Sequence, residues 1–62
     1  MLTRSELEAV ARTHADRLSG TCFMKPIMET ETSVTYRLYE WPDIPGHTIG
    51  YIALSYSGER VG

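Results

Sequence analysis

The residues from Val34 to Tyr56 carry apolar side chains in a pattern that would cover both faces of a two-stranded sheet. Successive side chains of a strand point to opposite faces, so apolar residues at both parities give two apolar faces. The rest of the chain predicts only one helix, and one helix covers only one face of a sheet. We therefore expect the second face to be covered or used by something else. The aromatic residues of this segment are Tyr36, Tyr39, Trp41, Tyr51 and Tyr56.

The N-terminal part of the chain predicts an amphipathic helix from about Arg4 to Leu18 or Ser19. Thr3 and Glu6 form a capping-box pattern at its start. Gly20 follows its end, where a left-handed residue is common. The helical period predicts a core-facing stripe. Its members are Leu7, Val10, Ala11 and Leu18, with His14 in the gap.

Three strands are expected after the helix. The first, about Cys22 to Glu29, contains Pro26 and is predicted to lie at an edge, because proline donates no ladder hydrogen bond. Its apolar pattern leaves its orientation open between two parities. The alternative core sets are Phe23 with Ile27 and Met24 with Met28.

The second strand, about Val34 to Glu40 or Trp41, and the third, about Thr48 to Ser55, are joined by a stiff loop containing Pro42 and Pro45. One register gathers the aliphatic residues of both strands on a single face, and a slip by one residue would scatter them. It pairs Leu38 with Gly50, Tyr36 with Ile52 and Val34 with Leu54. The predicted core face is Val34, Tyr36, Leu38, Ile52 and Leu54.

These elements predict one α+β domain over residues 1–62, with an N-terminal helix packed on a three-stranded antiparallel meander (α-β-β-β). The segment Glu59–Gly62 is expected to be either a short tail or the beginning of a further segment. The order of the elements resembles the first four elements of a double-stranded RNA-binding domain. The resemblance is one of order only, because no motif residue of that family is matched and the basic cluster is absent.

Composition narrows the expected partners. Eight acidic and six basic residues give a net charge of −2, which disfavours duplex nucleic acid as a ligand. No apolar run is long enough to span a membrane and no signal-peptide pattern is present, so a cytoplasmic location is expected. The lone Cys22 excludes an intrachain disulfide, and with only two histidines no metal or cofactor is expected. Oligomerisation is the remaining common way to stabilise so small a fold.

The second face of the sheet is the strongest candidate site. Tyrosine, tryptophan and arginine are the residues in which binding energy concentrates at protein interfaces. The alternative is a solvated sheet face on which Arg37 stacks over Tyr39 or Tyr51. We expect an interface, first of all a homodimer, with a further protein target as a second possibility. The predicted partner-binding residues are Arg37, Tyr39, Trp41, Ile49 and Tyr51.

Single-stranded nucleic acid is the alternative ligand of the same face. Tyr39, Trp41 and Tyr51 could stack on bases, while Arg37 and Lys25 contact phosphates. The acidic residues near this region disfavour it. We therefore predict a small protein-interaction module, of the size common among accessory and regulatory proteins of bacteria and phages.

No catalytic motif is expected. His14 is predicted to pack under the sheet, with a ring nitrogen bonded to a tyrosine hydroxyl or a carbonyl. Asp43 and His47 flank the proline-rich loop, but an aspartate at such a place more often caps the turn through its own backbone. Cys22 is expected to be an inert core residue, because no base is placed beside it. We therefore predict a protein without enzymatic activity, and a small enzyme or metal site is the least favoured alternative. The residues of that alternative are His14, His47, Asp43 and Cys22.

Overall fold

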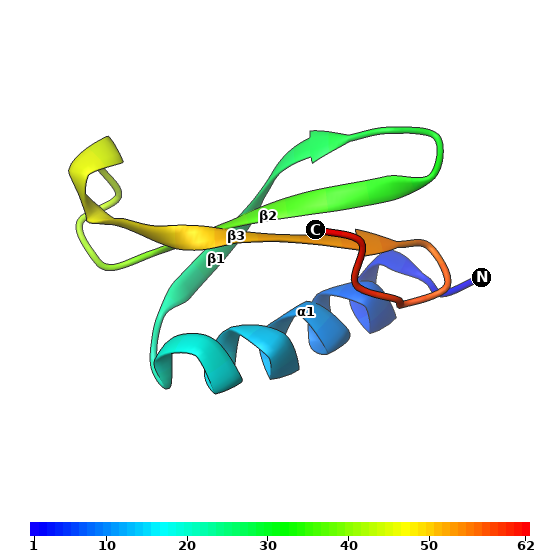
Figure 1. Ribbon diagram of the computed structural model, residues 1–62, viewed down its shortest axis with the longest axis horizontal. Helices are drawn as coiled ribbons and strands as arrows, with labels where there is room; N and C mark the ends of the chain where they lie inside the picture. Colours follow the sequence, from blue (N-terminus) through cyan, green and yellow to red (C-terminus); the bar gives the residue numbers. More distant parts are fainter.

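The computed structural model describes residues 1–62 as one helix and a three-stranded sheet. In chain order the elements are α1 (Arg4–Ser19), β1 (Phe23–Glu29), β2 (Ser33–Tyr39), the short 3-10 turn η1 (Pro45–His47) and β3 (Thr48–Ser55). The sheet is antiparallel in the order β1-β2-β3 and α1 lies under one of its faces (Figure 1). The predicted α-β-β-β α+β fold is therefore confirmed.

The ends of α1 follow the sequence signals. The backbone N–H of Glu6 donates to the Thr3 hydroxyl at 3.2 Å, and the backbone N–H of Thr3 donates to the Glu6 carboxylate at 2.8 Å. This reciprocal capping box satisfies two of the free N–H groups at the helix start. At the other end Gly20 adopts a φ of 67° and its N–H donates to the carbonyl of Asp16.

The core lies between α1 and the lower face of the sheet. The predicted register of β2 and β3 is observed, with Tyr36 opposite Ile52. All five predicted strand residues are buried, and the helix adds three more. The buried residues are Leu7, Ala11, Ala15, Val34, Tyr36, Leu38, Ile52 and Leu54.

The helix stripe differs from the prediction in its last turn. Ala15 is fully buried, whereas Leu18 exposes 54% of its surface. The buried helix residues recur at every fourth position, and the small side chains of Ala11 and Ala15 let α1 lie close to the sheet. Cys22 and Met24 are half-buried against the core where the chain passes from α1 into β1. The prediction of Leu18 as a core residue was therefore wrong.

A β-bulge in β1 explains why the orientation of this strand could not be read from the sequence. Pro26 pairs with Tyr36 and Met28 pairs with Thr35, so Ile27 is an extra residue with no partner in β2. The bulge interrupts the alternation of faces. Met24 contacts the core, whereas the other three apolar residues are exposed. Neither predicted core set is therefore buried as a whole, although β1 is an edge strand as expected.

After β3, the last strand, the chain turns and runs back along that same strand. Gly58, with a φ of 93°, lies in the turn. Beyond it Glu59–Gly62, here called the tail, runs along the outer edge of β3 (Figure 1). The N–H of Val61 donates to the carbonyl of Ala53 at 2.8 Å, and the N–H of Ala53 donates to the carbonyl of Gly62 at 3.2 Å. The tail thus covers part of one edge of the sheet.

Candidate functional site: the open face of the sheet

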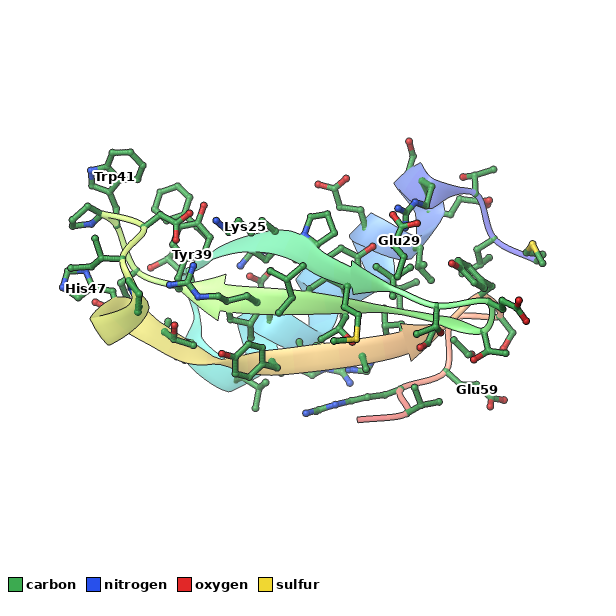
Figure 2. The ribbon with its side chains drawn as sticks, turned by 90° about the horizontal axis from the view of Figure 1, so that it is seen from above. Lys25, Glu29, Tyr39, Trp41, His47 and Glu59 are labelled. Atoms are coloured by element: carbon green, nitrogen blue, oxygen red, sulfur yellow. The ribbon has the colours of Figure 1, made fainter.

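The face of the sheet opposite α1, here called the open face, has no element of the chain packed over it (Figures 1 and 2). Cross-strand partners share a face, so Phe23 lies beside Tyr39, Lys25 beside Arg37, and Arg37 beside Tyr51. Large apolar side chains are exposed on this face and on the adjoining loop. They are Phe23, Ile27, Met28, Trp41, Ile44 and Tyr51.

Arg37 is the structural centre of the open face. Its side chain is only 11% exposed, and three of its nitrogens have partners. Nε donates to the Thr48 hydroxyl at 2.8 Å, Nη2 donates to the carbonyl of Ile44 at 2.8 Å, and Nη1 donates to Asp43. The bulge at Ile49 makes the first bond possible, because it shifts the register so that Thr48 pairs with Tyr39. Arg37 therefore fastens the loop between β2 and β3 to the sheet.

Asp43 completes this network from the loop. Its Oδ2 accepts a hydrogen bond from Nζ of Lys25 at 2.5 Å, while its Oδ1 faces Arg37. The hydrogen bonds from Lys25 and Arg37 hold the pKa of Asp43 below its ordinary value, because they stabilise the ionised carboxylate. At neutral pH the open face therefore carries one carboxylate between two cations, so one of the two positive charges is compensated within the chain.

An aromatic cluster lies at the end of the open face beside the loop. The rings of Phe23 and Tyr39 are stacked, with centroids 5.7 Å apart. The guanidinium of Arg37 lies 5.0 Å from the centre of the Tyr39 ring and the Lys25 ammonium lies 5.8 Å from it. Trp41 approaches Phe23 at a centroid distance of 6.2 Å but stays 71% exposed at the tip (Figure 2). The stacking of Arg37 on Tyr39, which is part of the predicted alternative of a solvated sheet face, is thus present, and Trp41 projects beyond it.

A shallow hollow of about 570 Å³ lies between these groups. Ile27, Pro45 and Tyr51 form apolar walls, and the polar groups that line it are Lys25, Arg37, Asp43 and Thr48. The nitrogens of Arg37 already have partners, and the larger part of the exposed lining is apolar. Such a surface suits an apolar or aromatic side chain of a partner better than an anion.

The predicted site residues divide into two groups. Arg37 is largely buried and Tyr39 half-buried, and both stabilise the face. Trp41, Tyr51 and Ile49 are exposed by 71%, 54% and 37% respectively. Four exposed residues were missing from the prediction because the β1 bulge and the course of the loop leave no signal in the apolar pattern. They are Phe23, Ile27, Met28 and Ile44.

The remaining polar candidates lie apart from one another. Nδ1 of His47 lies 3.1 Å from the carbonyl of Pro42, and Asp43 binds the two cations instead of capping its own turn as predicted. His14 is half-buried on α1 without a hydrogen bond to its ring, which differs from the expected bonded ring. Cys22 is half-buried, and its carbonyl accepts a hydrogen bond from Arg12 at 2.6 Å. No three His, Cys, Asp or Glu side chains gather closely enough to hold a metal ion.

No protein-family model matches the chain, and neither a curated protein nor a solved structure matches it. No helix has both the length and the apolar character needed to cross a membrane. The functional inference therefore rests on the geometry of the open face.

Proposed function

We propose that this protein is a small, non-catalytic interaction module that associates with a second copy of itself through the open face. The supporting observation is the contrast between the two faces of one sheet. α1 covers the lower face, whereas large apolar side chains stay exposed on the upper one. A second copy would supply the missing layer, and the resulting interface would be isologous, with the same patch on both subunits.

The size of the exposed patch supports this proposal. Phe23, Trp41 and Tyr51 are exposed by 52%, 71% and 54%. Since an aromatic side chain carries about 150–250 Å² of surface, these three alone present on the order of 300 Å². Ile27, Met28 and the loop extend the patch toward the roughly 800 Å² per partner of a stable interface. A core of only 8 buried residues would gain from such a layer.

The loop that carries Trp41 is held in place before any partner arrives. Arg37 bonds to Asp43 and to the carbonyl of Ile44, and Lys25 bonds to Asp43 from the neighbouring strand. A surface ordered in advance loses less conformational entropy on association. The carboxylate of Asp43 compensates one of the two positive charges, so the network presents a single residual positive charge to a partner. A nucleic-acid strand, in contrast, would need Lys25 and Arg37 to leave Asp43.

The edges of the sheet favour association through the face. β1 carries Pro26 and the bulge at Ile27, both of which oppose the addition of another strand. The tail covers part of the outer edge of β3. The open face is therefore the larger available contact surface.

A matched pair of variants tests the proposal. Met28 on the open face and Leu18 on α1 are both apolar and are exposed by 58% and 54%. We expect Met28→Ser to weaken self-association at least about tenfold, since it exposes a hydroxyl where an apolar contact is proposed, and Leu18→Ser to leave it unchanged. Analytical ultracentrifugation of both variants measures the effect. Equal dissociation constants for the two variants would overturn the proposed use of the open face.

A further inference from the structure

Trp41 projects from the loop without entering the hollow of its own chain. Its indole is 71% exposed, approaches the ring of Phe23 at a centroid distance of 6.2 Å, and is not among the residues that line the hollow. The loop holds this ring in a fixed place, because the backbone N–H of Glu40 donates to the carbonyl of His47 at 3.0 Å. One copy of the protein thus presents a large projecting side chain and a separate hollow at the same end of the sheet.

The hollow suits an indole in size and in chemistry. It has a volume of about 570 Å³ and apolar walls formed by Ile27, Pro45 and Tyr51. The network of two cations and one carboxylate adds a single residual positive charge to the lining. The face of an aromatic ring is negative, and tryptophan attracts cations more strongly than tyrosine or phenylalanine does. An indole therefore matches both the walls and the charge of the hollow.

The charge of the residue beside Trp41 gives a second match. Glu40 is exposed and takes part in none of the ion pairs of the chain. Lys25, which lines the hollow, stays 46% exposed although it bonds to Asp43. A Trp41 side chain that enters the hollow of another copy brings the negative charge of Glu40 toward this positive charge. Opposite charges that meet across an interface favour one arrangement of the partners over others.

The places of the two features on the sheet suit a symmetric pair. Trp41 lies beside Phe23 of β1, whereas Thr48 and Tyr51 of the hollow belong to β3 (Figure 2). When two open faces meet, the two-fold axis lies between the sheets and turns one of them over. The β1 side of one copy can then lie on the β3 side of the other. The symmetry repeats every such contact, so the two copies exchange the same contact twice.

We propose that Trp41 of each copy inserts into the hollow of the other copy, against Tyr51 and Ile27, so that two reciprocal contacts hold the pair together. This inference rests on the proposed self-association and names the contact that gives it affinity. Each insertion covers an indole that is 71% exposed and a tyrosine that is 54% exposed. Tryptophan and tyrosine in such enclosed places are typical of the few residues that dominate binding energy.

Two variants that each remove one half of the contact provide the test. Trp41→Ala lacks the indole but keeps the hollow, whereas Tyr51→Ser keeps the indole but lacks one wall of the hollow. Both side chains are more than half exposed, so both variants should fold. Ile27→Ser, on a different strand, is a second hollow variant. A mixed pair of Trp41→Ala and Tyr51→Ser keeps one of the two reciprocal contacts, whereas a pair of either variant with itself keeps none.

The single tryptophan makes the mixed pair visible. The Trp41→Ala protein has no tryptophan, so the emission of a mixture reports only Trp41 of the Tyr51→Ser chain. Titration of Tyr51→Ser with Trp41→Ala should shift this emission to shorter wavelength as the indole leaves water. The matched control titrant, the double variant Trp41→Ala/Tyr51→Ser, lacks the wall of the hollow and should give no shift. Ultracentrifugation should show that the mixed pair binds at least about tenfold more tightly than either variant binds itself.

The failure of this inference differs from the failure of the proposed function. If the wild type dimerises but the mixed dissociation constant lies between those of the two variants, and the emission does not shift, the insertion of Trp41 is overturned and self-association is not. The mixture of Ile27→Ser with Trp41→Ala should repeat the result obtained with Tyr51→Ser, and an unshifted emission there would count equally against the insertion. A wild type that stays monomeric would overturn both.

Discussion

Arg37 in β2 donates a hydrogen bond from Nη1 to the carboxylate of Asp43, which lies in the loop beyond the end of that strand. The same guanidinium reaches Thr48 in β3, so one side chain connects two strands and the loop between them. This contact gives the loop a fixed position at one end of the open face. Trp41 projects from that fixed loop.

Replacing Arg37 should therefore loosen the whole loop. We expect Arg37→Met to lower the free energy of unfolding by about 2 kcal/mol, because hydrogen bonds to a charged group are lost and Asp43 keeps only Lys25. Arg37→Lys should recover only part of the loss, since an ammonium group cannot reproduce the planar fork of donors. Urea unfolding of the three proteins measures the difference. Equal stability of Arg37→Met and the wild type would contradict the central role of this side chain.

Asp43 should make stability depend on acidity. Its folded-state pKa lies below the ordinary value of 3.8, first because of the hydrogen bond from Lys25 and then because of that from Arg37. A carboxyl with a depressed pKa stabilises the fold above its unfolded pKa, and this contribution is lost as the pH falls through the folded pKa. Glu6, whose pKa is lowered by the backbone of Thr3, acts in the same direction. The free energy of unfolding of Asp43→Asn and of the wild type is measured between pH 6 and pH 2, about two units on either side of 3.8. As the pH falls, this free energy should decrease less steeply in Asp43→Asn than in the wild type. An unchanged slope would contradict the bonding of Asp43.

The close approach of α1 to the sheet depends on its alanines. Ala15 is fully buried, so Ala15→Leu forces a larger side chain into the packed space between α1 and the sheet. We expect the free energy of unfolding to fall by about 1–3 kcal/mol. Leu18→Ala should change stability by less than about 0.5 kcal/mol, because Leu18 is already 54% exposed. Thermal unfolding of both variants gives the comparison. A larger loss for Leu18→Ala than for Ala15→Leu would show that the last turn of α1 belongs to the core.

Tyr39 and Trp41 should respond differently to truncation although they lie close together. Tyr39 is half-buried against Phe23 and under Arg37, so Tyr39→Ala should lower stability by about 1 kcal/mol or more. Trp41 is 71% exposed, so Trp41→Ala should leave the melting temperature almost unchanged and weaken self-association. Calorimetry and ultracentrifugation of both variants separate the two effects. If Trp41→Ala lowers only the melting temperature, Trp41 belongs to the fold and not to the interface.

The regular parts of this fold could be predicted from the sequence because each depends on local chemistry. Thr3 and Glu6 mark the start of α1, and the alternation of Val34, Tyr36 and Leu38 determines which face of β2 is buried. The same alternation placed Arg37 and Tyr39 on the other face. These features require only the period of a helix or a strand.

The remaining features depend on irregularities and long-range contacts. The bulge at Ile27 leaves the residues of β1 with no simple alternation, so Phe23 and Met28 could not be assigned to the open face. The hydrogen bond between Lys25 and Asp43 joins residues that are 18 positions apart. No sequence pattern predicts that these two side chains meet. The pairing of the tail with Ala53 could not be predicted either, because it depends on the turn at Gly58 and on a free edge of β3.

The mass of the protein in solution, measured by sedimentation equilibrium across micromolar to millimolar concentration, tests the central claim most directly. The proposal predicts that the mass rises from the 7.0 kDa of one chain toward twice that value. The emission of Trp41, the only tryptophan, should shift to shorter wavelength over the same range as its exposed ring is covered. A mass that stays at 7.0 kDa over the whole range, with unchanged tryptophan emission, would contradict self-association through the open face.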